Sequence, residues 1–221
     1  MPDGPKSFFL NPEAQAYLVD HSRPADDVLE TLVEETRKAT GGLSLMQIAP
    51  EQGAFMQLLV AATGARSAIE VGTFTGYSSI CIARGLPEDG RLLCLDTSEE
   101  WTEIARRAWE KAGVAHKIEL QIAPAADALR ALPEDTRFDF AFIDADKPNY
   151  GVYYDEILKR MPSGGLIVCD NVLWMGAVID PEAKDENTLA IRAFNDRVAG
   201  DARVETAMIA VGDGLLLARK R

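Results

Sequence analysis

Residues 143–150 read I-D-A-D-K-P-N-Y, so two carboxylates, Asp144 and Asp146, stand beside the ammonium of Lys147. They directly follow F-D-F-A-F-I, an apolar run of the kind that is typical of a buried strand. A charge at the end of a buried segment needs water, an oppositely charged partner or a metal ion. Because carboxylates bind hard metals and an amine can accept a proton, this stretch is a candidate for chemistry.

A second polar pair, Asp170 and Asn171, ends the apolar run G-L-I-V-C. If the two runs are neighbouring parallel strands, Asp144, Asp170 and Asn171 meet at one edge of the sheet. Two carboxylates and an amide are hard oxygen ligands that leave octahedral positions open, as Mg²⁺ prefers. We therefore predict a divalent cation on these three residues, with Mg²⁺ as the expected ion and Ca²⁺ or Mn²⁺ as alternatives. The other interpretation of Asp170 and Asn171 is a strand-end turn with ordinary side-chain caps.

A calcium loop of the EF-hand type is a rival interpretation of the D-A-D triplet. Such a loop requires glycine at its sixth position and glutamate at its twelfth, whereas this chain has Asn149 and Asp155 there. The pattern therefore excludes that loop.

The elements that must position these residues alternate along the chain. From residue 67 onward, five apolar runs are each followed by a segment with helical spacing. These runs span 67–71, 91–95, 117–122, 138–143 and 165–170. Strand-then-helix units in series form a parallel sheet with helices on both faces. The chain closes with two runs joined by G-D-G, a hairpin signal that adds one antiparallel strand.

Three helices are expected before the sheet. The first begins at Pro12 after Asn11, the second spans about 24–40, and the third runs from Pro50 to Gly64. The stretch L-S-L-M-Q-I-A between the last two is predicted to be a linker.

The predicted fold class is α/β, a doubly wound and mostly parallel sheet with a C-terminal antiparallel hairpin strand and extra N-terminal helices. A chain of 221 residues is long enough for one core. We therefore predict a single domain over 1–221, with a helical cap region at 1–64 and an α/β core at 65–221. In such sheets ligands bind at the carboxyl ends of the strands.

The composition argues against several classes of function. The net charge of −12 disfavours nucleic acid, since phosphate contacts need clustered basic residues. No run approaches the roughly 20 apolar residues of a membrane helix, and the first residues lack a signal-peptide pattern. We expect a cytoplasmic protein that binds neither nucleic acid nor membrane. Cys81, Cys94 and Cys169 stand far apart in apolar surroundings, which predicts buried reduced thiols.

The first strand leads into E-V-G-T-F-T-G-Y-S, where Gly72 and Gly76 allow the backbone to approach a ligand closely. The spacing G-x-x-x-G matches neither a dinucleotide fold nor a phosphate loop. Asp96 ends the second strand, where an acid can accept both hydroxyls of an adenosine ribose. Together these features predict a nucleoside cofactor without pyrophosphate, such as S-adenosylmethionine (SAM), with Ala125 under its adenine. The alternatives are a tight turn for the glycines and a helix N-cap for Asp96.

Several motifs in order resemble the cation-dependent, SAM-dependent O-methyltransferases of the caffeoyl-CoA and catechol type. They are E-V-G-T-F-T-G-Y-S, D-A-D-K, C-D-N-V-L-W and the closing G-D-G-L-L-L-A-R, together with the N-terminal K-S and M-Q-I-A-P-E-Q-G. The resemblance covers nearly the whole chain. It implies the Rossmann-like sheet of class I methyltransferases and a homodimer.

The resemblance also assigns roles to individual residues. The SAM contacts that it implies are Ile48, Glu70, Gly72, Thr73, Ser78, Asp96, Ala125, Asp144 and Asp146. The cation ligands that it implies are Asp144, Asp170 and Asn171. Lys147 matches the lysine beside the reacting hydroxyl, with Asp144 as the second catalytic residue. The substrate contacts that we expect are Lys6, Lys147, Trp174 and Met175.

Met175 is a departure from the pattern of the family. The plant caffeoyl-CoA enzymes carry a polar Asn that touches substrate at this position. Met175 therefore puts a CoA ester in doubt and indicates a smaller or more apolar acceptor. For Trp174 and Met175, a place in the pocket and simple loop packing both stay open.

We expect a metal-dependent enzyme that transfers a methyl group from SAM to one hydroxyl of a catechol-type phenolic small molecule. A cation that binds two adjacent hydroxyls lowers the pKa of the phenol, and Lys147 can take the proton if the cation and partial burial lower its own pKa. The alternative for Lys147 is a salt bridge to Asp146. Two other functions stay open, methylation of a non-catechol acceptor and SAM binding without catalysis. The missing G-x-G-x-x-G argues against a dehydrogenase.

Overall fold

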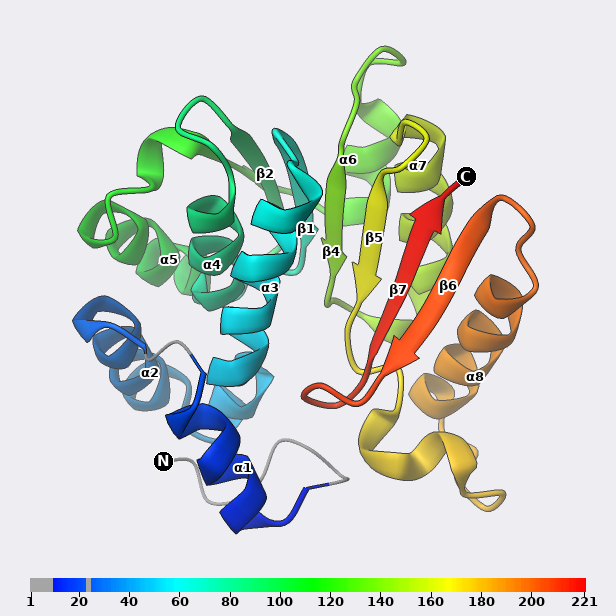
Figure 1. The fold of residues 1–221 in the computed structure, drawn as a ribbon, viewed down its shortest axis with the longest axis horizontal. Coiled ribbons are helices and arrows are strands. Elements are labelled where there is room, and N and C mark those ends of the chain that lie inside the picture. Colours follow the sequence, from blue (N-terminus) through cyan, green and yellow to red (C-terminus); the bar gives the residue numbers. More distant parts are fainter. Residues whose placement is uncertain (1–9, 23–24) are drawn as a thin grey trace.

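Seven strands form one sheet in the computed structural model, which describes residues 10–22 and 25–221 (Figure 1). The strands are β1 (Ser67–Val71), β2 (Arg91–Asp96), β3 (Ile118–Ile122), β4 (Phe140–Ile143), β5 (Leu166–Cys169), β6 (Val204–Ile209) and β7 (Leu215–Lys220). Their order across the sheet is β3-β2-β1-β4-β5-β7-β6. Strands β1 to β5 pair in parallel, whereas β7 is antiparallel to both β5 and β6. The predicted doubly wound fold with one antiparallel closing strand is confirmed.

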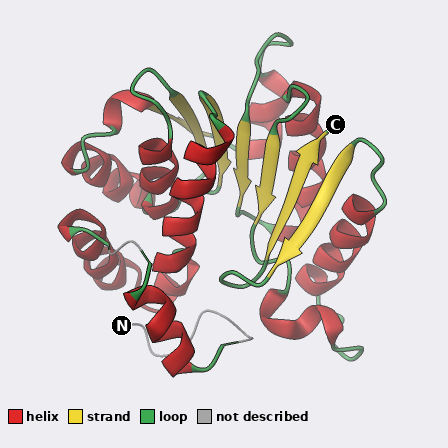
Figure 2. Ribbon diagram, viewed as in Figure 1, coloured by secondary structure: helices red, strands yellow, loops and turns green. Residues whose placement is uncertain are grey.

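Helices of the described residues pack on both faces of this sheet (Figure 2). The α-helices are α1 (Pro12–Asp20), α2 (Asp27–Thr40), α3 (Pro50–Thr63), α4 (Tyr77–Gly85), α5 (Glu99–Lys111), α6 (Ala125–Ala131), α7 (Tyr150–Arg160) and α8 (Glu186–Ala199). The short 3-10 helices are η1 (Gly41–Met46), η2 (Ala115–Lys117), η3 (Lys147–Asn149) and η4 (Trp174–Ile179).

The central strands divide their side chains between two hydrophobic cores. Phe140 and Phe142 of β4 pack in the core formed with α2, α3, α4 and α5. Ala141 and Ile143, which alternate with them, pack in the core formed with α6, α7 and α8. Figure 1 shows α3 in front of the sheet and α7 behind it. Because β4 is buried on both faces and apolar at every position, it was recognisable as a continuous apolar run.

The N-terminal helices follow the expected order, with two differences. Helix α2 begins at Asp27 and not near residue 24, because the Asp26 carboxylate accepts a hydrogen bond from the Leu29 N–H (3.1 Å) and so caps the helix there. The predicted linker is partly helical, since η1 occupies its first half. Helix α1 begins at Pro12 with Asn11 as its cap, as predicted.

Gly72 joins the end of β1 to the end of β4. Its φ is 89°, a left-handed conformation that favours glycine. A Cβ atom at this position would lie 1.9 Å from the backbone oxygen of Asp144, far inside van der Waals contact. Glycine therefore allows two strand ends to touch at the point where the strand order reverses.

Glu70 is an ionisable residue within the central strand β1. Its side chain is completely buried, and Cys94 Sγ lies 3.4 Å from its Oε2. Burial raises the pKa of Glu70 to about 8, against the opposing effect of the hydroxyls of Ser78 and Thr73 and of the Cys94 thiol. All three cysteines are buried, reduced thiols, as predicted.

We expect Gly72→Ala to lower the free energy of unfolding by about 2–4 kcal/mol, because the methyl group clashes with backbone and the φ is unfavourable for alanine. Urea denaturation followed by tryptophan fluorescence measures the change. Gly42→Ala is the matched control, since a Cβ at Gly42 meets no atom within 4 Å. Equal stability of the two variants would contradict the role given to Gly72.

We expect Glu70→Gln to change how stability depends on pH. The folded-state pKa of Glu70 lies above its unfolded value of 4.5, so its stabilising contribution is complete below that value and is lost as the pH rises toward about 8. Relative to Glu70→Gln, the wild type should lose roughly 2–4 kcal/mol between pH 5 and pH 8. Urea titrations of both proteins at pH 5, 6.5 and 8.5 measure the difference, and a constant difference at all three would refute this account.

Candidate active site

A cavity of about 800 Å³ opens where β1, β2 and β4 end. Most of the site residues predicted from the sequence line it, although they come from widely separated parts of the chain. They are Ile48, Gly72, Thr73, Ser78, Asp96, Ala125, Asp144, Asp146, Lys147, Asn171 and Trp174. The cavity therefore lies at the carboxyl edge of the sheet, where ligands bind in doubly wound folds.

Three predicted residues do not line the cavity. Glu70 is buried within β1, and Asp170 is only 2% exposed at the end of β5. Met175 is 59% exposed, and its backbone N–H donates to Asp213 (2.7 Å). Trp174 and Met175 both have left-handed backbone, and this tight turn brings Trp174 into the cavity wall but leaves Met175 outside it. Lys6 falls outside the described residues.

Asp96 links the end of β2 by hydrogen bonds to the loop at residues 72–76 between β1 and α4, which we call the glycine loop. One carboxylate oxygen accepts hydrogen bonds from the N–H groups of Thr73 (2.9 Å) and Phe74 (2.8 Å), and the other accepts from the N–H of Ser98 (2.8 Å). Ser98 itself caps α5, so an N-cap role for Asp96 is wrong. These donors hold the carboxylate at the cavity wall, where its remaining lone pairs can accept hydrogen bonds from hydroxyl groups of a ligand.

Apolar side chains form the cavity wall near Asp96. Phe74 and Trp101 pack edge to face, with 5.0 Å between ring centroids. Ala125 and Ala126, at the start of α6, line the same cavity. Apolar walls next to a hydroxyl-accepting carboxylate suit a purine nucleoside.

A buried hydroxyl and amide network attaches the N-terminal helices to the glycine loop. The Thr36 hydroxyl donates to Thr75 Oγ1 (2.8 Å), and Gln47 Nε2 lies 3.2 Å from both hydroxyls. Thr36 is on α2, Gln47 follows η1, and Thr75 belongs to the loop after β1. The helical cap and the loop are therefore held in one arrangement beside the cavity.

Lys147 lies between Asp144 and Asn171, and these three residues form what we call the polar end of the cavity. Its Nζ donates to Asp144 (3.1 Å), to Asn171 (2.7 Å) and to the hydroxyl of Tyr150 (2.8 Å). The side chain is 7% exposed, and Nζ lies 5.5 Å from the centroid of the Trp174 ring. A buried ammonium with this many partners is held in one position.

The predicted alternative of a salt bridge between Lys147 and Asp146 is wrong. The short helix η3 directs Lys147 toward Asp144 instead. Asp146 is bound by the hydroxyl of Tyr153 and by Asn149 Nδ2 (2.6 Å). Asp146 therefore has neutral hydrogen-bond donors, and its charge faces the cavity.

The oxygen atoms of Asp144, Asp170 and Asn171 fit a hard divalent cation. Asp144 and Asn171 already share one cation, the Lys147 ammonium. Burial and, to a smaller extent, the negative charge of Asp144 raise the pKa of Asp170 to about 7, so the two carboxylates repel. A divalent ion would relieve this repulsion. Within the described residues, no group of three or more His, Cys, Asp or Glu is arranged to hold a metal ion.

Sequence reasoning missed two residues that contact this polar end or the adjacent Asp170. Gln52 of α3 donates to Asp170, and Tyr150 of α7 both accepts from Lys147 and donates to the backbone oxygen of Asp170 (3.1 Å). Burial raises the pKa of Tyr150 above its ordinary value, so it stays a neutral donor. Tyr150 follows Lys147 by three residues, a spacing that could have indicated contact across one helical turn.

Among residues 10–22 and 25–221, no helix has the length and apolar character required to cross a membrane.

Comparisons with known proteins agree with this geometry. A family model described as O-methyltransferase matches residues 19–221. A protein of Dictyostelium discoideum named probable caffeoyl-CoA O-methyltransferase 1 is 40% identical over 208 residues, which is 92% of this chain and 90% of that protein. A caffeoyl-CoA O-methyltransferase of Mesembryanthemum crystallinum is 38% identical over 187 residues, 80% of this chain and 74% of that one.

Solved structures give the same result. An O-methyltransferase from Bacillus cereus in complex with SAH (S-adenosylhomocysteine) superposes with a TM-score of 0.87 at 36% identity, covering 95% of this chain and 97% of that chain. An O-methyltransferase from Streptomyces achromogenes involved in tomaymycin synthesis, solved in complex with SAM, has a TM-score of 0.86 at 33% identity, with 94% and 96% covered. The expected enzyme class is confirmed, and this chain belongs to the O-methyltransferase family.

Proposed function

We propose that this enzyme transfers a methyl group from SAM to one hydroxyl of a catechol-type phenol, with a divalent cation, Mg²⁺ by preference, held by Asp144, Asp170 and Asn171. The observation that carries the proposal is the position of Lys147. Its Nζ lies within hydrogen-bond distance of two of the proposed ligands and in the wall of the same cavity as the Asp96 loop.

The cofactor end of the cavity supports SAM. The solved structures from Bacillus cereus and Streptomyces achromogenes contain SAH and SAM, respectively. The Asp96 carboxylate, already oriented by three backbone donors, would accept the ribose hydroxyls. The apolar wall with Trp101 and Ala125 would take the adenine. SAM supplies an activated methyl group on sulfur, so the protein has only to align an oxygen behind that carbon and keep water away.

The proposed cation site at Asp144, Asp170 and Asn171 supports an acceptor with two adjacent hydroxyls. A divalent cation bound there supplies positive charge that lowers the pKa of a phenol and orients it. Lys147 would first lose a proton to solvent, and its neutral amine, held by Asn171 and Tyr150, would then take the proton that leaves the reacting hydroxyl. Trp174 lines the cavity beside this amine and would pack against the aromatic ring.

The cavity wall also favours a free catechol over a CoA ester. Among the described residues that line the cavity, Lys147 is the one lysine or arginine. CoA carries several phosphate charges, and phosphates are usually bound by basic side chains or backbone N–H groups. Leu45 and Met46, which line the cavity from η1, are more than half exposed and present apolar surface instead. These observations support an uncharged aromatic acceptor.

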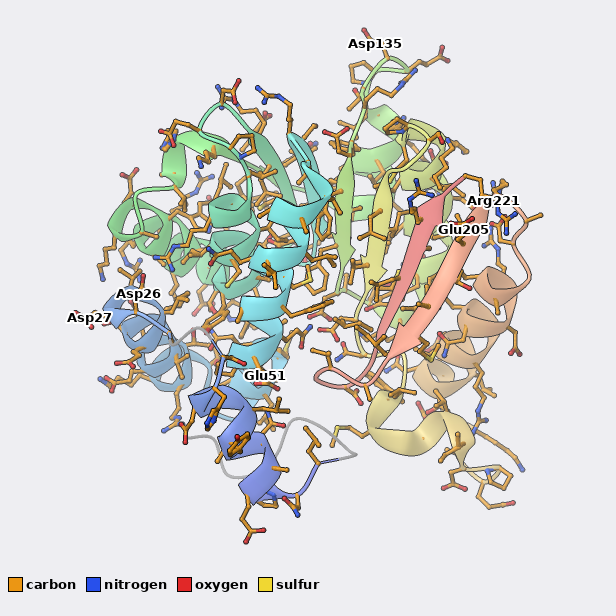
Figure 3. All side chains as sticks on the ribbon, viewed as in Figure 1. Asp26, Asp27, Glu51, Asp135, Glu205 and Arg221 are labelled. Atoms are coloured by element: carbon orange, nitrogen blue, oxygen red, sulfur yellow. The ribbon has the colours of Figure 1, made fainter. Side chains whose placement is uncertain are left out.

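The proposed metal dependence gives a direct test. Methyl transfer from SAM to a simple catechol should stop with EDTA and return with excess Mg²⁺, and Asp170→Ala should lower kcat/KM by about 100-fold or more. Liquid chromatography with mass spectrometry measures the methylated product. Asp135→Ala, on a loop at the opposite edge of the sheet (Figure 3), is the control that should behave as wild type. Full activity in EDTA would exclude the proposed metal.

Lys147 can be tested separately from the metal. Lys147→Met keeps the apolar stem and removes the amine, so kcat should fall about 10²–10⁴-fold while the Kd for SAM, measured by calorimetry, changes little. Lys147→Arg keeps the positive charge and cannot accept a proton. If Arg restores most of kcat across pH 6–9, Lys147 only balances the charge of Asp144, and the role as a base is wrong.

A further inference from the structure

Gln52 contacts the most deeply buried member of the proposed cation site. Its Nε2 donates to Asp170 Oδ2 at 2.7 Å, across a separation of 118 residues in the sequence. The other oxygen of Asp170 accepts the backbone N–H of Asn171 at 2.6 Å. The carboxylate is thus fixed from both sides, by its own backbone on one and by α3 on the other.

The amide of Gln52 is itself tightly confined. The side chain is 2% exposed, and a Cβ atom on Gly212, in the turn between β6 and β7, would lie 2.4 Å from Gln52 Oε1. The turn therefore packs against the far side of the amide, while Asp170 occupies the near side. A glycine at 212, with φ of 56°, leaves just enough room for Gln52 to reach Asp170.

The first turn of α3 cannot rotate to release this contact. Glu51, next to Gln52, accepts a hydrogen bond from Gln15 of α1, and Figure 3 shows its side chain between the two helices. Gly53, on the other side, packs so closely on α4 that a Cβ atom would lie 2.7 Å from the Tyr77 ring. With neighbours held on two sides, the helix presents Gln52 to Asp170 in one orientation.

We propose that Gln52 is a positioning residue for the divalent cation, which it serves by holding the Asp170 carboxylate in place. This inference rests on the proposed metal site. A neutral amide donor orients the carboxylate and leaves its full negative charge for the metal, whereas a lysine or arginine here would compete with the metal. Without the amide, Asp170 Oδ2 would be buried without a partner and free to turn away.

The test is metal affinity, measured on the full chain with Mn²⁺ as the probe, by electron paramagnetic resonance of free Mn²⁺. Gln52→Met keeps the volume of the side chain and removes the donor, and it should raise the Kd for Mn²⁺ about 10–100-fold. The Kd for SAM should stay within about twofold, because Gln52 does not line the cavity. Gln57→Met, on the same helix α3, is the matched control and should bind Mn²⁺ as wild type does.

A split in the kinetics separates positioning from general damage. In Gln52→Met the Mn²⁺ concentration that gives half-maximal activity should rise with the Kd, while kcat at saturating Mn²⁺ stays within a few-fold of wild type. If Gln52→Met folds poorly, Gly212→Ala tests the same contact, because its methyl group pushes on Gln52 Oε1 while Gln52 and Asp170 are retained. That variant should also bind Mn²⁺ more weakly.

The outcomes distinguish the two proposals. Wild type that binds no Mn²⁺ overturns the metal site and the role of Gln52 together. Mn²⁺ binding that is lost in Asp170→Ala but unchanged in Gln52→Met or Gly212→Ala overturns the role of Gln52 alone. Equal losses of Mn²⁺ and SAM affinity in Gln52→Met would mean a structural defect and would also overturn it.

Discussion

The site depends on equivalent backbone hydrogen bonds that form where neighbouring parallel strands end. The N–H of Gly72 donates to Leu95, that of Asp144 donates to Val71, and that of Asp170 donates to Ile143, each at 2.9 Å. These bonds extend the ladder of three strand pairs by one residue. Because parallel pairing sets the register, the residues that follow β1, β4 and β5, which are Gly72, Asp144 and Asp170, lie in one row. A slip of one residue would turn each of them to the other face of the sheet.

This row brings like charges together in a poorly solvated place. Asp144 raises the pKa of Asp170, and it adds to the larger effect of burial on Glu70. One ammonium, that of Lys147, balances part of this charge through its contacts with Asp144 and Asn171. An unbalanced cluster of buried carboxylates is unfavourable, and proteins accept it where the charge serves binding or catalysis.

The sequence was sufficient to predict the sheet and the row of strand-end residues, since both follow from apolar periodicity and from the rule that parallel strands end together. Side-chain contacts between elements that are distant in the sequence could not be predicted from it. Gln52 lies on a predicted helix, but nothing in its surroundings indicates that it contacts Asp170. The alternative of a salt bridge between Lys147 and Asp146 failed for the same reason, because η3 turns the side chain away from its close neighbour Asp146. Met175 was expected at the substrate, yet two left-handed residues turn it outward.

Because β7 runs antiparallel to β5, its direction decides where the enzyme can be attached to a support. Its G-D-G turn reaches the edge that holds the cavity, where Asp213 binds the backbone of Met175, and from there the strand runs away to the opposite edge. Arg221, which follows β7, therefore lies toward the opposite edge of the sheet from the G-D-G turn, as Figure 3 shows. A surface linker or fusion partner attached at that end would leave the entrance open, so the enzyme can be immobilised there with its site directed away from the support.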